Sequence, residues 1–212
     1  MGLKNLRCNP RAEMLKRAYF INSKILGTIG TCTLYEVERN FLFRKITILT
    51  TSNEKNERIL IDAFFPYNNG SLAVGYVDCR EQLLKRGAII GTSAMNGCAL
   101  EVRYNKDLRL YRFVHDKNGT GISNTKFWEN NPGWELICRI TWEGYMRDIL
   151  PINKLYAVQL LCVFDGECFH VGRWLFDIDK CANSNYSEIK LHSKLSDSYL
   201  GQFNSTTPLI IT

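Results

Sequence analysis

Short apolar runs, rich in β-branched and aromatic residues, alternate along most of the chain with polar or glycine-containing segments. This pattern is typical of strands separated by turns. The dipeptide Asp165-Gly166, which lies between two apolar runs, is the strongest hairpin signal, because it favours a tight turn between antiparallel strands. The pattern predicts strands over residues 41–51, 58–65, 72–77, 88–104, 108–117, 134–142, 154–164 and 167–177.

Helix signals are fewer. Asn9-Pro10 combines a capping side chain with a first-turn proline and predicts a basic helix over about residues 10–20. A second short helix is predicted over residues 78–86, with Gly87 ending it, and a single helical turn over residues 125–130. The polar, weakly patterned tail over about residues 180–212 predicts irregular structure. We therefore expect an α+β fold with a mixed, mostly antiparallel, β-sandwich-like core and peripheral helices.

The composition narrows the class of protein. A chain of 212 residues with 45% hydrophobic and 23% charged residues fits a single domain over residues 1–212. The net charge of +6 comes from Lys and Arg residues scattered singly or in pairs, which argues against a nucleic-acid partner.

No stretch has the length of a membrane span, so we expect no stable membrane insertion. Residues 19–34 resemble a secretory signal poorly, and we expect no cleaved signal peptide.

The chain contains eight cysteines and no Cys-x-x-Cys pair. A chain of this size needs no disulfide staples, so we interpret most of these cysteines as reduced and partly buried thiols. We expect neither a metal nor a cofactor. The cysteines are Cys8, Cys32, Cys79, Cys98, Cys138, Cys162, Cys168 and Cys181.

Cys98 and His115 lie on two runs that predict a hairpin with its turn at Lys106-Asp107. This register places Cys98 directly opposite His115, on a face with apolar neighbours, and pairs Glu101 with Arg112 on the other face. A slip by one residue would mix the two faces. Face polarity and charge pairing therefore favour the same register.

Directly opposed residues have Cβ atoms about 4.5–5.5 Å apart, so a thiol and an imidazole can meet. A histidine that accepts the thiol proton leaves a thiolate, the reactive form of cysteine. Gly97 permits close approach to the backbone, and amides near Asn96 to Cys98 can stabilise an oxyanion. The same two residues would also be ordinary in a protein core.

The other two histidines offer weaker pairs. Cys168 and His170 are two residues apart on one strand, about 7 Å from each other, which is too far for direct proton transfer. Cys162 would face away from both, which argues against a zinc site made by the three. His192 lies in the polar tail.

Residues 92–98 read TSAMNGC, and residues 110–116 read LYRFVHD. These two segments resemble the deamidase toxins of the cytotoxic necrotizing factor type, especially Burkholderia lethal factor. Those proteins have a motif ending in Ser-Gly-Cys, a histidine after a strand and turn, and in the lethal factor a threonine six residues before the cysteine. Here Asn96 replaces the serine. The resemblance covers residues 92–116.

The resemblance implies that Cys98 is the nucleophile, that His115 is the base and acid, and that Thr92 orients the histidine through its side chain or its backbone carbonyl. It implies a bacterial toxin or effector that deamidates a glutamine of a host protein. A small Rho-type GTPase or a translation factor would be the substrate. A monomer is expected, secreted or translocated into the host cytoplasm.

Two other functions fit the same residues. A Cys–His protease or transglutaminase-like acyltransferase would use Cys98 and His115 with another leaving group or acceptor. A non-catalytic binding module would use its cysteines structurally and its tryptophans as a protein-binding surface. Those tryptophans are Trp128, Trp134, Trp142 and Trp174.

Overall fold

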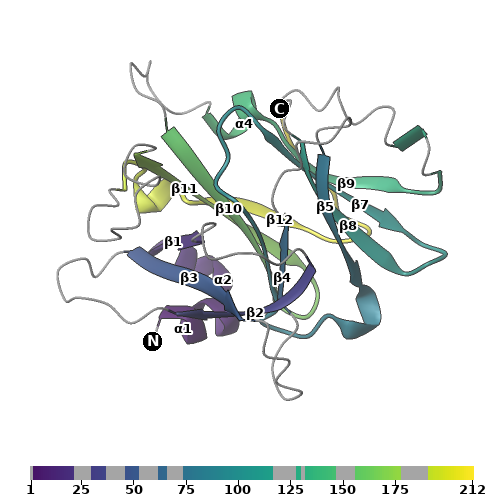
Figure 1. Cartoon of the computed structure of the whole chain (residues 1–212), viewed down its shortest axis with the longest axis horizontal. Coiled ribbons are helices and arrows are strands. Elements are labelled where there is room, and N and C mark those ends of the chain that lie inside the picture. The colour runs from purple at the N-terminus through teal and green to yellow at the C-terminus, as the bar shows by residue number, and fades with distance from the viewer. Residues whose placement is uncertain are drawn as a thin grey trace.

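Strands make up most of the computed structural model (Figure 1). The described residues are 2–21, 30–36, 46–52, 62–65, 74–116, 128–129, 132–146, 156–177 and 191–212. The helices are α1 (Gly2–Cys8), α2 (Pro10–Met14) and α4 (Trp142–Met146), with 3-10 turns at Glu81–Leu83 and Leu195–Asp197. The strands are β1 (Ala18–Ile21), β2 (Gly30–Glu36), β3 (Ile46–Ser52), β4 (Asp62–Phe65), β5 (Val74–Arg80), β6 (Ile89–Thr92), β7 (Ala99–Asn105), β8 (Leu110–Asp116), β9 (Glu135–Ile140), β10 (Tyr156–Phe164), β11 (Phe169–Asp177), β12 (Tyr199–Phe203) and β13 (Leu209–Ile211).

These strands form two sheets. The larger sheet has the order β1-β3-β2-β4-β6-β10-β11-β12, and the smaller has the order β13-β9-β7-β8-β5. Pairing is antiparallel except between β1 and β3, β4 and β6, and β13 and β9. The expected α+β fold, a mixed and mostly antiparallel sandwich with short helices beside it, is confirmed.

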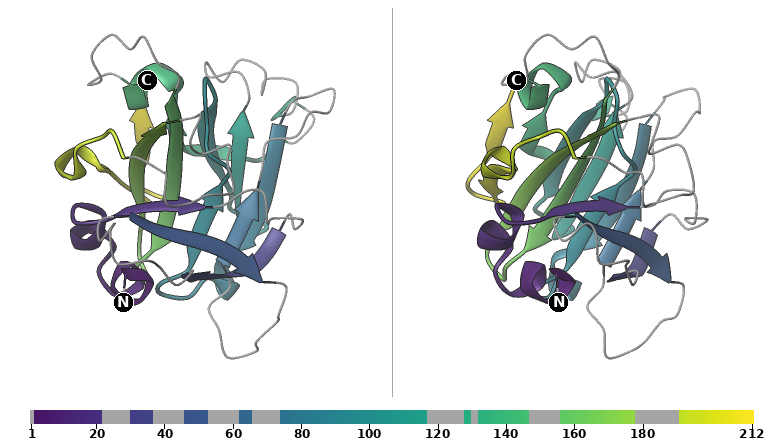
Figure 2. Two further views of the ribbon diagram at one scale, coloured as in Figure 1. Left: turned by 60° about the vertical axis from the view of Figure 1, so that its left-hand side comes forward. Right: turned by 90° about the vertical axis from the view of Figure 1, so that its left-hand side faces the viewer.

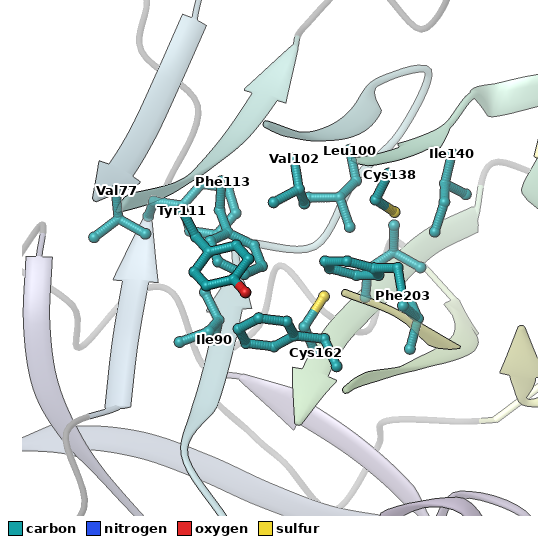
Figure 3. Close-up of a cluster of buried hydrophobic side chains, with 14 of the residues drawn as sticks. Val77, Ile90, Leu100, Val102, Tyr111, Phe113, Cys138, Ile140, Cys162 and Phe203 are labelled. Carbon is teal, nitrogen blue, oxygen red and sulfur yellow. The ribbon is translucent and has the colours of Figure 1, made fainter. Parts of the chain in front are cut away.

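The main core lies between the two sheets (Figure 3). Alternate residues of each strand enter it, as the pleat of a strand requires. Val102 and Phe113 come from the smaller sheet, and Ile90, Cys162 and Phe203 come from the larger sheet. Each of these side chains is almost fully buried.

A second core covers the opposite face of the larger sheet. Ile21 of β1 and Ile48 of β3 pack there with Trp174 and Phe176 of β11. Figure 2 shows β1 and β3 running across the green strands β10 and β11 at a steep angle. The larger sheet is therefore strongly curved, so that β1 and β3 pack against β10 and β11. Both faces of β6 and β10 are buried as a result.

The N-terminal helix is shorter than the predicted one. Asn9 caps α2 as expected, because its Oδ1 accepts a hydrogen bond from the Ala12 backbone N at 3.4 Å. The helix ends at Met14, however, and residues 18–21 form β1, so the predicted helix over residues 10–20 was wrong beyond its first turns. These four residues are all buried and pair with β3, and that burial outweighs their helix propensity.

Three further predicted elements had wrong bounds. The predicted helix over residues 78–86 is a strand up to Arg80 and then a single 3-10 turn, because β5 pairs with β8 along this length. The predicted strand over residues 88–104 is two strands, β6 and β7, which belong to different sheets. The predicted strand over residues 134–142 ends at Ile140, and Trp142 begins α4.

The polar composition predicted an irregular C-terminal tail, but its described part, residues 191–212, contains strands β12 and β13. β12 pairs with β11 at the edge of the larger sheet, and β13 pairs with β9 at the edge of the smaller. Edge strands are half-exposed, so they lack the apolar pattern that reveals a core strand. Most of the predicted helical turn at residues 125–130 and the predicted strand residues 41–45 and 58–61 lie outside the described residues.

Candidate active site

The three predicted catalytic residues lie where strands from both sheets begin or end. Thr92 is the last residue of β6 in the larger sheet, and His115 is the next-to-last residue of β8 in the smaller sheet. Cys98 directly precedes β7, which neighbours β8. The fold therefore gathers residues from two sheets near one end of the inter-sheet core.

The connection over residues 93–98 carries the chain from one sheet to the other. Met95 anchors it to β10, since its backbone N donates to the Val158 carbonyl at 2.7 Å and its carbonyl accepts from the Val158 N at 2.8 Å. Gly97 has a φ of +76°, a conformation that favours glycine. Cys98 therefore follows a bend that is held on one side by the pairing of Met95 with β10 and on the other by strand β7.

The register between β7 and β8 differs from the predicted one. Leu100, not Cys98, pairs directly with His115, because the turn comprises residues 106–109 rather than two residues. Arg109, at the end of this turn, has a φ of +50°. A shift by two residues keeps each side chain on its predicted face, since side chains alternate with a period of two. In regular pairing Cys98 would then be a diagonal neighbour of His115, at about 7–8 Å, instead of a direct one.

The predicted pair of Glu101 and Arg112 was also wrong. Glu101 lies opposite Val114, and its carboxylate contacts Arg103 at 2.7 Å and Arg139 at 2.9 Å. Arg112 instead binds the Asp78 carboxylate of β5, at 2.7 and 2.8 Å. The smaller sheet carries its charge pairs on the predicted face, but with other partners.

Thr92 and His115 are in direct contact across the two sheets. The Thr92 Oγ1 lies 2.6 Å from the His115 Nδ1 and 2.6 Å from the Phe65 carbonyl oxygen. A carbonyl oxygen can only accept, and a hydroxyl has one hydrogen, so Thr92 donates to Phe65 and accepts from Nδ1–H. This arrangement selects the tautomer of His115 in which Nε2 carries the lone pair.

Burial keeps the His115 ring neutral. The side chain is fully buried, and this desolvation lowers its pKa to about 3. At neutral pH the ring is therefore an imidazole with Nδ1 protonated and Nε2 able to accept a proton. The neutral ring can accept a proton at Nε2, and a pKa of about 3 makes it a weak base.

Cys98 lies at the boundary between the core and the surface. Its side chain is 9% exposed, and its Sγ donates to the Asn96 carbonyl oxygen at 3.7 Å. Asn96 is exposed, and a Cβ added to Gly97 would meet nothing within 4 Å. Open space thus adjoins the backbone immediately before the cysteine.

Two contributors to this site were absent from the sequence prediction. The Tyr145 hydroxyl of α4 donates to the Cys98 carbonyl oxygen at 2.8 Å. The Phe65 carbonyl oxygen accepts a hydrogen bond from the Thr92 hydroxyl. The hydrogen-bond partner of a backbone carbonyl cannot be recognised in a sequence. Tyr145 is 47 residues from Cys98, so only the fold brings these two residues together.

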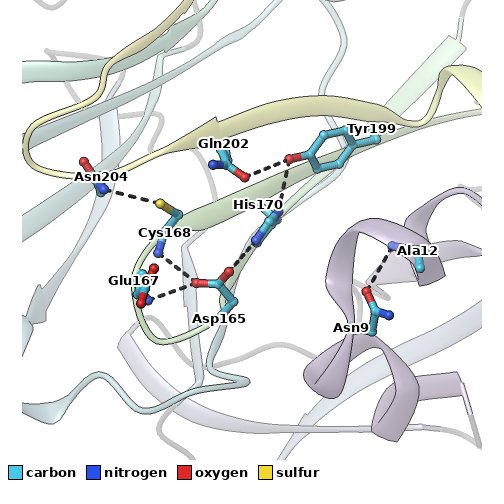
Figure 4. Close-up of polar contacts among 9 residues, drawn as sticks. All are labelled: Asn9, Ala12, Asp165, Glu167, Cys168, His170, Tyr199, Gln202 and Asn204. Atoms are coloured by element: carbon cyan, nitrogen blue, oxygen red, sulfur yellow. Dashed lines mark hydrogen bonds and ion pairs between the residues drawn. The ribbon is translucent and has the colours of Figure 1, made fainter.

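His170, the alternative histidine, belongs to another network (Figure 4). Its Nε2 lies 2.7 Å from the Asp165 Oδ2, and its Nδ1 lies 3.1 Å from the Tyr199 hydroxyl. Burial alone would raise the pKa of Asp165, but hydrogen bonds from the Cys168 and Glu167 backbone N–H groups and from His170 lower it. The Cys168 Sγ accepts a hydrogen bond from Asn204 instead, at 3.3 Å.

The remaining thiols that the structure describes are mostly core residues. Cys32, Cys79, Cys138 and Cys162 are buried, reduced thiols, and burial raises the pKa of Cys32 and of Cys79 to about 12. Cys162 pairs with Val171 and faces the inter-sheet core. Among the described residues, no group of three His, Cys, Asp or Glu side chains could hold a metal ion.

No protein-family model matches the chain, and no curated protein matches it in sequence. Within the described part of the chain, no helix has both the length and the apolar character needed to cross a membrane.

Proposed function

We propose that this protein is a cysteine-dependent deamidase that converts a glutamine side chain of another protein to glutamate. Cys98 is the nucleophile, His115 is the base and then the acid, and Thr92 orients the histidine. The resemblance of residues 92–116 to deamidase toxins supports the reaction type. The contact between Thr92 and His115, next to the strand that follows Cys98, supports the proposed roles.

The observation that carries the proposal is the hydrogen bond between Thr92 and His115. Thr92 and His115 are 23 residues apart and come from different sheets, yet the two polar groups meet at 2.6 Å in a buried space. A buried histidine in a purely structural role needs only some partner. Here the partner fixes the tautomer that leaves the lone pair on Nε2.

The proposed reaction has two stages. In the first, Sγ attacks the carboxamide carbon while the thiol proton passes to Nε2. The C–N bond then breaks, the nitrogen takes that proton and leaves as ammonia, and a thioester remains. In the second, His115 takes a proton from water, the resulting hydroxide attacks the thioester, and the C–S bond breaks. The thiolate regains the proton and glutamate is released.

The tetrahedral intermediates of both stages carry a negative oxygen. Backbone N–H groups near Asn96 and Gly97 are our candidates for stabilising it, since they adjoin both the cysteine and the open space beside Gly97. Fixed backbone donors stabilise such an oxyanion without reorganisation. The anchoring of Met95 on β10 holds this segment in place.

The test uses the whole chain with a purified Rho-type GTPase, a purified translation factor and a host-cell extract. Mass spectrometry of the proteins should find one glutamine converted to glutamate, a gain of about one mass unit, with ammonia released. Cys98→Ser and His115→Gln should abolish the conversion. Cys168→Ser, a matched change of a thiol beside another histidine, should leave it intact.

Other outcomes would overturn the proposal. Cleavage of the backbone of a target would identify a protease, and incorporation of added methylamine in place of hydrolysis would identify an acyltransferase. Activity that survives Cys98→Ser but is lost in Cys168→Ser would show that Cys168, not Cys98, is the nucleophile. If no glutamine changes in any target and Cys98 is no more reactive than the other thiols, the protein is a binding module.

A further inference from the structure

Gln159 is a fully buried amide in a strand that is otherwise apolar around it. It lies in β10 between Val158 and Leu160, and all three residues are 0–1% exposed. Burying an amide without hydrogen bonds is strongly unfavourable. A polar residue at this place therefore needs specific partners.

Its partners include the residue that orients the histidine. Nε2 of Gln159 donates to the Thr92 carbonyl at 2.7 Å and to the Leu160 carbonyl at 3.1 Å, and Oε1 accepts from the Ile21 backbone N at 3.0 Å. The carbonyls and the N–H group determine which end of the amide points where. Gln159 thus ties the end of β6 to β1 and β10.

The backbone explains why Thr92 needs this bond. Gly91 pairs with Leu161, and the next contact along the two strands joins Met95 to Val158. Three residues, 92–94, therefore face two residues, 159–160, so the pairing contains one extra residue, as in a β-bulge. Regular pairing is interrupted at Thr92. At this point the side-chain amide of Gln159 donates a hydrogen bond to the backbone carbonyl of Thr92. Bulges beside active sites commonly re-aim a side chain.

We propose that Gln159 is a positioning residue that holds Thr92 in the orientation from which its hydroxyl bonds both Phe65 and His115. It acts through Thr92 and does not touch the reacting atoms. This role rests on the proposed function, in which the tautomer of His115 matters for the reactivity of Cys98. It adds a residue that neither the spacing nor the resemblance indicated.

The test compares Gln159→Met, which keeps the volume and removes the hydrogen bonds, with Val163→Ala in the same strand. Val163 is buried on the same face of β10 and packs in the second core, so its truncation destabilises the fold without touching Thr92. Gln159→Asn serves as a second variant that keeps the amide but cannot reach Thr92. Two properties are measured: the ¹⁵N NMR shifts of the His115 ring, and the pH profile of Cys98 alkylation by iodoacetamide.

We expect the wild type and Val163→Ala to show the tautomer with Nδ1 protonated. The Gln159 variants should show a mixture of tautomers and an alkylation rate lower by about tenfold to a hundredfold, the loss typical of a misplaced catalytic group. Unchanged ring shifts and rates in a folded Gln159 variant would overturn the inference, as would equal changes in Val163→Ala. If His115→Gln leaves Cys98 alkylation unchanged, the proposed function fails, whereas the ring shifts still report on Gln159.

Discussion

At the scale of single residues, the site depends on the one hydrogen of the Thr92 hydroxyl. Its donation to Phe65 forces Thr92 to accept from His115, and this fixes which ring nitrogen can act as a base. The sequence predicted Thr92 through a resemblance, without deciding between its side chain and its backbone. The side chain contacts His115, and the backbone carbonyl is bound by Gln159.

Thr92→Val should preserve the shape of the residue while removing this acceptor. The buried Nδ1–H would lose its hydrogen bond to Thr92, at a cost of about 1–3 kcal/mol in the free energy of unfolding, and the tautomer would no longer be selected. Cys98 alkylation should slow, and Thr92→Ser should restore most of the rate. Urea unfolding and mass spectrometry of the alkylated thiol measure the two effects. Equal alkylation rates in Val and Ser variants would contradict this role of the hydroxyl.

Tyr145→Phe removes only the hydroxyl that bonds the Cys98 carbonyl. The ring keeps its contact with Trp142, so the fold should lose only about 1 kcal/mol of stability, the net value of one hydrogen bond. We expect the kcat of the proposed deamidation to fall while KM stays unchanged, since the carbonyl belongs to Cys98, the proposed nucleophile. A change confined to KM would place Tyr145 in substrate binding instead.

At the scale of elements, the two hairpins show what the pattern of apolar residues can and cannot predict. Both hairpins were expected, and both have turns two residues longer than expected: Leu100 pairs with His115, and Phe164 pairs with Phe169. The alternation of a strand identifies its faces, and these were correct. The length of a turn depends on local backbone geometry, such as the positive φ of Arg109 and Gly166, which the pattern does not encode.

The charge pairs on the smaller sheet test the observed register. A double-mutant cycle between Glu101 and Arg139 should give a coupling free energy of about 0.5–3 kcal/mol, because the two groups are in contact and Glu101 is almost fully buried. The cycle between Glu101 and Arg112 should give almost none, since Arg112 binds Asp78. The opposite result would restore the register in which Cys98 directly opposes His115.

At the scale of the whole molecule, burial of the site couples its chemistry to the stability of the fold. The sandwich was predictable because its strands carry strong apolar patterns. The edge strands β12 and β13 were not, since half-exposed strands carry weak ones. The hydrogen bonds of Gln159 and Tyr145 were likewise hidden, because each joins residues far apart in the chain.

Acid should weaken the fold through His115. Its pKa is about 3 in the folded protein and about 6.5 when unfolded, so the unfolded state binds more protons between these values. The stability from the neutral ring is therefore complete above pH 6.5 and falls as the pH drops, by up to about 1.4 kcal/mol per unit. Urea unfolding between about pH 4.5 and 6.5, above the range in which Asp165 titrates, should show a smaller slope for His115→Gln. Equal slopes in both proteins would contradict the buried, neutral ring.

The most direct test of the pair is the alkylation of all thiols by iodoacetamide at about pH 6, where an ordinary thiol is unreactive. Cys8 is exposed and serves as an internal reference, while Cys98 is only 9% exposed. If His115 activates Cys98, Cys98 reacts faster than Cys8 in the wild type and slower than Cys8 in His115→Gln. If Cys98, relative to Cys8, reacts equally fast in the wild type and in His115→Gln, His115 does not activate it, and the proposed chemistry is contradicted.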